Sequence, residues 1–210
     1  MALFITFEGG EGTGKSLQIR LLYKRLSKLG IPVLLTYEPG GTSFGRRIAR
    51  LLKWSQDVNI FPAAELILFN ASRAQLVDEV LKPALKDGKV VICDRYADST
   101  TAYQGYGRGL NLEMVKAINE AATGKLEPDL TILLDMPVEE GLARKRLKKP
   151  DRFEQEDLAF HQRVRGGYLK MVANDPQRWL LVDGRQPKGE IAKIIWLRVS
   201  KLISEQGKHG

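Results

Sequence analysis

Five short segments of the chain are continuously apolar, and each of them ends in an acidic residue. They are residues 3–8, 32–38, 89–94, 129–135 and 178–183. Strands that helices cover on both faces of a parallel sheet have this continuous hydrophobic character, whereas strands with one wet face alternate. We therefore predict five buried parallel strands. Ligands of open α/β sheets bind at the carboxyl ends of the strands, so we expect the chemistry where these acids gather.

Segments with helical spacing separate the predicted strands. In the first, apolar residues between Ile19 and Leu29 recur three or four positions apart, and Gly30 ends the pattern. Strands alternating with helices predict an α/β fold, here three layers with helices on both sides of the sheet. We find no repeat, low-complexity tract or linker, and expect residues 1–210 to form one domain. A further helix is expected to begin after Pro137, and the others cover about residues 63–86, 112–122, 158–173 and 188–204.

The charge balance favours anionic partners. The chain has 33 Lys and Arg against 25 Asp and Glu, a net charge of +8. This suits a protein that binds a polyanion or one whose substrates are phosphates, and composition does not choose between them. A single cysteine, Cys93, excludes an internal disulfide framework and fits a reducing compartment. No apolar run is long enough to cross a membrane, and residues 1–8 resemble a buried strand rather than a signal peptide, so we expect a cytoplasmic protein.

A phosphate-binding loop follows the first predicted strand directly and precedes the first predicted helix. The segment matches G-x-x-x-x-G-K-[ST] in the strand–loop–helix context that supports the assignment. Its glycines let successive backbone N–H groups point at phosphate oxygens, Lys15 supplies a positive charge to the β- and γ-phosphates, and the Ser16 hydroxyl is a Mg²⁺ ligand. Leu17 stands where a dinucleotide-binding G-x-G-x-x-G loop needs glycine, and the D-x-x-G and N-K-x-D strings of Ras-type GTPases do not occur. The predicted ATP-binding residues are Gly9, Gly10, Glu11, Gly12, Thr13, Gly14, Lys15 and Ser16.

Three further segments carry a resemblance to a known family. They are residues 38–42 (EPGGT), 68–75 (LFNASRAQ) and 94–105 (DRYADSTTAYQG). Together with the phosphate loop they closely resemble the thymidylate kinase family, which transfers the γ-phosphate of ATP to dTMP. The resemblance runs from about residue 3 to about residue 183. It implies a P-loop nucleoside monophosphate kinase fold with strand order 2-3-1-4-5, Mg²⁺ with ATP as phosphate donor, and a homodimer formed through helices.

The resemblance also implies which residues hold the acceptor. Phe69 and Arg73 lie four apart on a predicted helix and share a face, so an aromatic ring can stack on a base while a guanidinium donates to its carbonyl edge. Phe69 alone would more simply be a core residue. The guanidinium of Arg95 matches a phosphate dianion and is assigned the acceptor phosphate. The dTMP-binding residues implied in this way are Glu8, Pro39, Phe69, Arg73, Arg95, Thr100, Tyr103 and Gln104.

Two strand-end carboxylates compete for the metal. The family pattern assigns Mg²⁺ to Asp94, through water, together with Ser16. Asp135 ends the fourth predicted strand and is the alternative. We prefer Asp94, and expect Asp135 to cap the helix that follows it.

The most basic part of the chain, residues 141–154, is predicted to be a lid. Residues 141–152 hold six basic residues against one acidic residue, and Pro150 breaks the helix. A solvated helix face and a nucleic-acid patch are the other interpretations of such a run. The variable positions of the phosphate loop hold Glu11 and no arginine, which in bacterial thymidylate kinases accompanies basic lid residues. Our candidates for transition-state neutralisation are Arg144 and Arg152 first, and Arg146.

We therefore predict an ATP:dTMP phosphotransferase in which Lys15, Arg95, Arg144 and Arg152 are catalytic. The alternatives are a P-loop kinase for another nucleotide or nucleoside and a P-loop protein that binds nucleic acid. Two positions depart from the usual bacterial pattern: Leu76 replaces a common histidine, and Lys148-Lys149-Pro150 lies in the lid.

Overall fold

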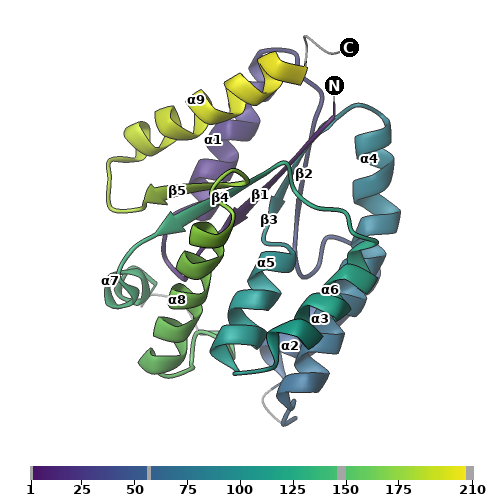
Figure 1. Cartoon of the computed structure of the whole chain (residues 1–210), viewed down its shortest axis with the longest axis vertical. Coiled ribbons are helices and arrows are strands. Elements are labelled where there is room, and N and C mark those ends of the chain that lie inside the picture. Colours follow the sequence, from purple (N-terminus) through teal and green to yellow (C-terminus); the bar gives the residue numbers. More distant parts are fainter. Residues whose placement is uncertain (1, 56–57, 146–149, 207–210) are drawn as a thin grey trace.

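Five parallel strands form one sheet at the centre of the molecule (Figure 1). The structure is a computed structural model and describes residues 2–55, 58–145 and 150–206. The strand order is β2-β3-β1-β4-β5, which confirms the order implied by the family resemblance. Each strand lies within a predicted segment; the bounds are β1 Leu3–Glu8, β2 Val33–Tyr37, β3 Val90–Asp94, β4 Leu130–Asp135 and β5 Trp179–Asp183.

Helices cover both faces of the sheet, and most were predicted. The predicted helix at 63–86 is one continuous helical run, α3–η1–α4, with a π-helical segment in its middle. Two helical regions were not predicted: α2, and α5 continued by the π-helical η2. The bounds are α1 Lys15–Lys28, α2 Ser43–Trp54, α3 Pro62–Leu76, η1 Val77–Leu81, α4 Lys82–Lys86, α5 Ala97–Thr100, η2 Thr101–Gly107, α6 Leu112–Thr123, α7 Val138–Ala143, α8 Leu158–Asn174 and α9 Lys188–Gln206.

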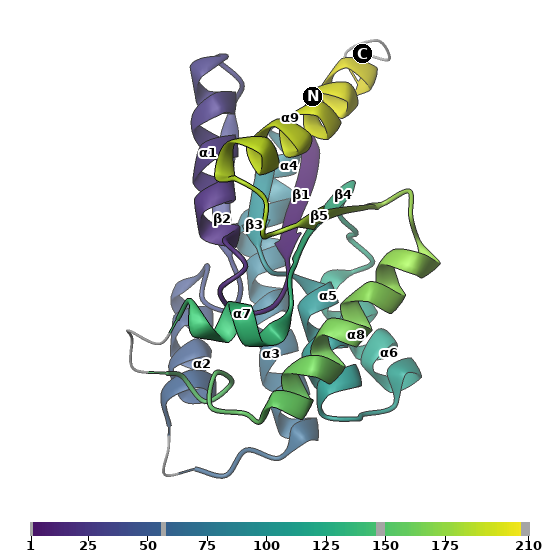
Figure 2. The same ribbon diagram turned by 90° about the vertical axis from the view of Figure 1, so that its left-hand side faces the viewer.

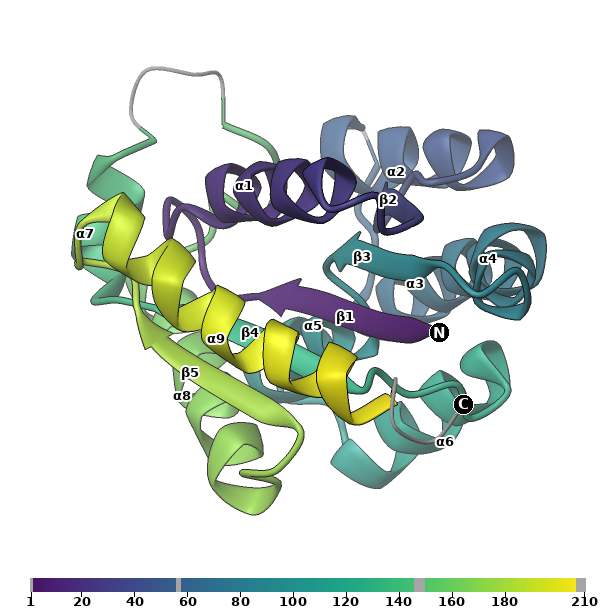
Figure 3. The ribbon, with the colours of Figure 1, turned by 90° about the horizontal axis from the view of Figure 1, so that it is seen from above.

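The strands are apolar at successive positions because each face of the sheet has its own core. In β1, Leu3, Ile5 and Phe7 pack against α1 and α9, whereas Phe4 packs on the opposite face with η1, α4 and Tyr96. Figures 1 and 3 show the same division, with α1 and α9 on one side and α3, α4, α5 and α8 on the other. Burial of each such side chain stabilises the fold by about 1.5–3 kcal/mol.

The acidic strand ends meet at one edge of the sheet, as predicted. Phe7 pairs with Asp94, the Glu38 N–H donates to the Asp94 carbonyl oxygen, and Asp135 pairs with Asp183. The β1–α1 loop and α7 lie at this edge (Figure 2). Their backbones approach closely: a Cβ built on Gly12, at φ +70°, would lie 1.9 Å from the Gly141 carbonyl oxygen. The phosphate loop and the start of the predicted lid are therefore held in contact.

Candidate functional site

The phosphate loop has the backbone that its glycines predict. Gly12 and Gly14 adopt positive φ angles of 70° and 93°, and Gly14 caps the amino end of α1. The Lys15 side chain turns back over the loop and donates to the carbonyl oxygens of Gly9 at 2.8 Å and Gly10 at 2.7 Å. Burial, together with Arg95, lowers the pKa of the Lys15 amine to about 8. A phosphate arriving at the loop would offer this amine a stronger, charged acceptor than two carbonyls.

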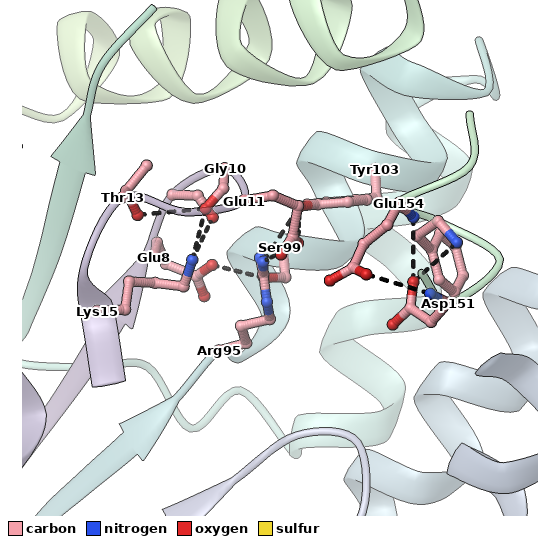
Figure 4. Close-up of polar contacts among 12 residues, drawn as sticks. Glu8, Gly10, Glu11, Thr13, Lys15, Arg95, Ser99, Tyr103, Asp151 and Glu154 are labelled. Atoms are coloured by element: carbon pink, nitrogen blue, oxygen red, sulfur yellow. Dashed lines mark hydrogen bonds and ion pairs between the residues drawn. The ribbon is translucent and has the colours of Figure 1, made fainter. Parts of the chain in front are cut away.

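Arg95 has a strained backbone and points its guanidinium into the site. Its φ is +70°, a left-handed conformation that non-glycine residues adopt at a cost of about 1–3 kcal/mol. Figure 4 shows Glu8 from β1, Lys15 from α1 and Arg95 from the end of β3 extending toward the same space below the loop. The Arg95 guanidinium donates to Ser99 Oγ at 3.2 Å and to Tyr103 Oη at 3.1 Å. The surrounding fold therefore holds this cation in place.

Glu11 of the phosphate loop bridges Arg95 and the predicted lid. Its Oε1 accepts from Arg95 at 2.8 Å, and its Oε2 pairs with Lys145, which also pairs with Glu154. Burial by itself raises the pKa of Glu11, but Arg95, Lys15 and Lys145 outweigh burial and hold that pKa well below its usual range. The Glu11 carboxylate lies where the cations Lys15, Arg95 and Lys145 converge. A negatively charged phosphoryl group would be stabilised at the same position.

Glu8 is a fully buried acid beside Arg95. It accepts from the Tyr96 N–H at 2.8 Å, from Ser99 Oγ at 2.5 Å and from Tyr168 Oη at 2.7 Å. Burial and the charge of Asp98 raise the pKa of Glu8 to about 7 despite Arg95 and these hydrogen bonds. Ser99 lay in the quoted 94–105 segment without an assigned role, and no sequence signal distinguished Tyr168 on α8.

A cavity beside Arg95 is lined by residues predicted to hold the acceptor. It leaves about 50 Å³ free for water-sized molecules. Phe153, from the end of the predicted lid, packs against Phe69 with ring centroids 5.6 Å apart and was not singled out in the sequence. Of the predicted acceptor residues, the lining includes Pro39, Phe69, Arg73, Arg95, Thr100, Tyr103 and Gln104; Glu8 contacts Ser99 of the same lining.

Arg73 has a structural role that its spacing from Phe69 did not predict. The side chain is 1% exposed and crosses the space between β2, α3, α5 and α6. All five of its N–H groups are engaged within the protein, so it reaches the cavity without a spare donor. The partners, at 2.7–3.2 Å, are Glu38 Oε2, Asn70 Oδ1, Asn119 Oδ1, the Tyr96 carbonyl oxygen and Thr100 Oγ1.

The candidate catalytic arginines of the predicted lid contact different parts of the protein. Arg144 donates to the Gly184 carbonyl oxygen at 3.3 Å and lines the space around the phosphate loop. Arg152 instead donates to the Leu52 carbonyl oxygen at 3.0 Å and pairs with Glu65 on α3, away from that loop. Arg146 and residues 147–149 lie outside the described residues. The structure thus brings Arg144 to the cavity around the phosphate loop and Arg152 to Glu65 on α3.

The oxygen donors predicted for the metal lie in one cavity. Ser16 and Asp94 both line the space beside Lys15, and a hydroxyl with a carboxylate fits Mg²⁺, which keeps several waters and takes phosphate oxygens. Asp135 forms a bidentate ion pair with Arg165 at 2.8 Å instead. Our expectation that Asp135 caps the next helix is wrong, because α7 is capped by Pro137 without a side-chain hydrogen bond and Arg165 takes the carboxylate.

Comparison with known proteins assigns the chain to a family. The sequence model of a family described as thymidylate kinase matches residues 7–195. This chain belongs to the thymidylate kinase family. The thymidylate kinase of Dehalococcoides mccartyi is 58% identical over 97% of this chain and 98% of its own length, and that of Syntrophotalea carbinolica is 48% identical over 99% of each. The crystal structure of thymidylate kinase from Ehrlichia chaffeensis superposes with a TM-score of 0.77 at 32% identity, covering 97% of this chain and 98% of that one.

Proposed function

We propose that the chain transfers the γ-phosphate of ATP to dTMP, giving ADP and dTDP. The observation that carries this is the meeting of two cavities: the one around the phosphate loop and the one beside Phe69 share Glu11, Lys53, Arg95 and Asp151 in their linings. A donor in the first and an acceptor in the second would place their phosphates on either side of Arg95. Family membership and the relatives named thymidylate kinase support the same reaction.

The donor would occupy the phosphate loop. Backbone N–H groups of residues 9–16 would bind its phosphates, Lys15 would move from the loop carbonyls to the β- and γ-oxygens, and Arg144 would approach from α7. Ser16 and Asp94 would hold Mg²⁺. When bound, that ion supplies positive charge to the phosphate oxygens.

The acceptor would lie between Arg95 and Phe69. Its phosphate would displace the Glu11 carboxylate from Arg95, and its base would stack on Phe69 and lie near Thr100, Tyr103 and Gln104. Glu8 would lie near the sugar and the metal. Arg73 would support the base pocket through Thr100 and Glu38 rather than lend a free donor.

Transfer needs charge neutralisation more than proton removal. The attacking atom is an oxygen of a phosphate monoester, which is already nucleophilic, so no general base is required. The transition state spreads negative charge over the transferred group, and preorganised cations around it supply most of the rate enhancement. Lys15, Arg95 and Arg144 would supply these cations. Arg152, which we predicted as catalytic, would join them only by leaving Glu65.

Assembly and location follow as further proposals. Apolar side chains on α2 and α3, namely Phe44, Trp54 and Ile67, are 48%, 50% and 58% exposed, which supports a homodimer through these helices. In the described ranges no helix is long and apolar enough to span a membrane, and the single cysteine supports a cytoplasmic location. Lys145 and Arg152 pair with acids, so the basic lid needs no nucleic-acid partner. We retain one domain over residues 1–210 as a prediction.

The replacement Arg95→Ala tests the assignment of the acceptor phosphate. We expect turnover to fall by about 10³-fold or more while ATP affinity, measured by calorimetry, stays near the wild-type value. Lys193→Ala removes an exposed cation of α9 that pairs with Glu190 and serves as the control, with unchanged turnover expected. Loss of ATP binding in Arg95→Ala, or turnover near that of the wild type, would refute the assignment.

A further inference from the structure

Glu65 on α3 is a fully buried acid with no part in the phosphate chemistry above. Its side chain is 0% exposed. Gln104 Nε2 donates to its Oε1 at 2.7 Å, and Arg108 reaches the two carboxylate oxygens at 3.2 and 3.3 Å. Arg152 pairs with Oε2. One carboxylate therefore joins two guanidinium groups to a side chain that lines the acceptor cavity.

The carboxylate decides how the Gln104 amide is turned. Glu65 accepts from two guanidinium groups, and the oxygens of a carboxylate can only accept hydrogen bonds. The atom of Gln104 that lies 2.7 Å away must then be the NH₂ group, which fixes an orientation that geometry alone would leave ambiguous. The carbonyl Oε1 consequently points away from Glu65.

Because Glu65 holds the NH₂ side of the amide, the carbonyl oxygen lies on the other side of Gln104, which is a residue of the acceptor-cavity lining. Gln104 is 1% exposed and belongs to the cavity lining with Phe69 and Thr100. Among the described residues, Oε1 has no hydrogen-bond partner, and it is not one of the polar atoms sealed in the interior. The cavity thus presents a fixed acceptor without a spare donor from the same amide.

A fixed acceptor distinguishes pyrimidine bases by chemistry. Thymine and uracil carry an imide N3–H, which donates to a carbonyl oxygen, whereas N3 of cytosine carries a lone pair that a carbonyl oxygen repels. We propose that Glu65 is a positioning residue that holds the Gln104 carbonyl toward the acceptor base and so selects nucleotides with an imide N–H against cytosine nucleotides. This inference rests on the proposed function, because it assumes that the base occupies this cavity.

The isosteric variant Glu65→Gln tests the role of the charge. With two guanidinium groups competing for its single amide oxygen, the introduced glutamine would turn its NH₂ toward Gln104, and the Gln104 amide would reverse to present NH₂ to the base. We expect the ratio of kcat/KM for dTMP to kcat/KM for dCMP to fall by about tenfold to a hundredfold, mainly through a higher KM for dTMP, with the KM for ATP unchanged. If turnover of dCMP is too slow to measure, its Ki against dTMP replaces its kcat/KM.

Arg108→Gln is the matched control. It removes one cation from the same cluster but leaves Glu65 paired with Arg152 and able to accept from Gln104. We expect both variants to lower the melting temperature and only Glu65→Gln to change the dTMP/dCMP ratio. A purely structural role of Glu65 would move the ratio in both variants or in neither, and either result would overturn the inference.

Gln104→Leu keeps the test decisive if Glu65→Gln does not fold. Leucine has a similar size and no polar atom, so we expect dTMP to lose its advantage over dCMP by about tenfold or more. A wild-type ratio in Gln104→Leu would overturn the inference while leaving the kinase activity intact. Absence of dTMP turnover in the wild-type protein would instead refute the proposed function itself, so the two failures are distinguishable.

Discussion

Replacing Arg73 with methionine should destabilise the fold strongly because it leaves the buried carboxyl group of Glu38 without its partner. The Arg73 Nε donates to Glu38 Oε2 at 2.8 Å, and the two side chains are 1% and 2% exposed. Glu38 Oε1 already has no hydrogen-bond partner among the described residues. Removing one member of a buried ion pair leaves its partner either as an uncompensated charge or as a carboxyl group that must take up a proton on folding, and this costs about 3–5 kcal/mol. We therefore expect the free energy of unfolding of Arg73→Met to be lower by about that amount at neutral pH.

The pH dependence of this loss identifies the carboxylate as its cause. Burial raises the pKa of Glu38 to about 7 even beside Arg73. Because its pKa is raised, folded Glu38 keeps its proton to a higher pH than Glu38 in the unfolded chain, whose pKa is 4.5. The contribution of protonated Glu38 to the free energy of unfolding is therefore fully present below pH 4.5 and is lost as the pH rises to about 7. Without Arg73 the pKa of Glu38 rises further. The wild type, half protonated at Glu38 at pH 7, also loses some stability in this interval, so the deficit of Arg73→Met should grow by up to about 1 kcal/mol between pH 7 and pH 8.

Urea unfolding followed by circular dichroism at pH 5, 7 and 8 measures both effects. The double variant Arg73→Met/Glu38→Gln carries no stranded charge, so we expect it to be more stable than Arg73→Met at pH 8 and to show no extra loss above pH 7. A deficit below about 1 kcal/mol, or one that is independent of pH, would refute the claim that Arg73 chiefly supports the pocket wall.

Three further perturbations test other parts of the site. Burial also raises the pKa of Glu8 to about 7, so the free energy of unfolding of the ligand-free wild type should fall as pH rises from 4.5 to 7. In urea titrations, Glu8→Gln should make this fall less steep by up to about 1.4 kcal/mol per pH unit. Glu11→Gln weakens the competition for Arg95, so the KM for dTMP should fall several-fold in steady-state assays; an unchanged or higher KM would contradict the competition. Gly12→Ala places a Cβ 1.9 Å from a carbonyl oxygen of α7, so we expect kcat to fall by about a hundredfold. Gly166→Ala is the control: its Cβ meets nothing within 4 Å, so kcat should not fall.

The sequence predicted the features whose cause is local. The strands were found because burial on both faces demands continuous apolar segments, and the phosphate loop was found because its glycines encode backbone angles directly. The gathering of Glu8, Asp94 and Asp135 at one edge followed from parallel topology. The helix at 43–54 was missed although Thr42 caps it and Ile48 and Leu52 are buried at helical spacing.

Long-range partners could not be predicted, because no spacing rule encodes them. Arg73 meets Asn119 across 46 positions, and Arg152 meets Glu65 across 87. Sequence reasoning gave both arginines free donors for substrate, whereas tertiary contacts take those donors. Helical spacing correctly placed Arg73 and Phe69 at the same cavity, but it could not indicate that Glu38 would pair with Arg73. The role of Glu65 arises in the same way, from three partners on η2 and beyond.

An acceptor survey measures the central claim most directly. ADP release coupled to NADH oxidation is followed with ATP–Mg²⁺ and, in turn, dTMP, dUMP, dGMP, AMP and thymidine. The two cavities joined at Arg95 and the family assignment predict the highest kcat/KM with dTMP and no comparable turnover of thymidine, which lacks the phosphate that Arg95 would bind. Faster turnover of AMP, dGMP or thymidine than of dTMP would contradict the assignment of the acceptor site.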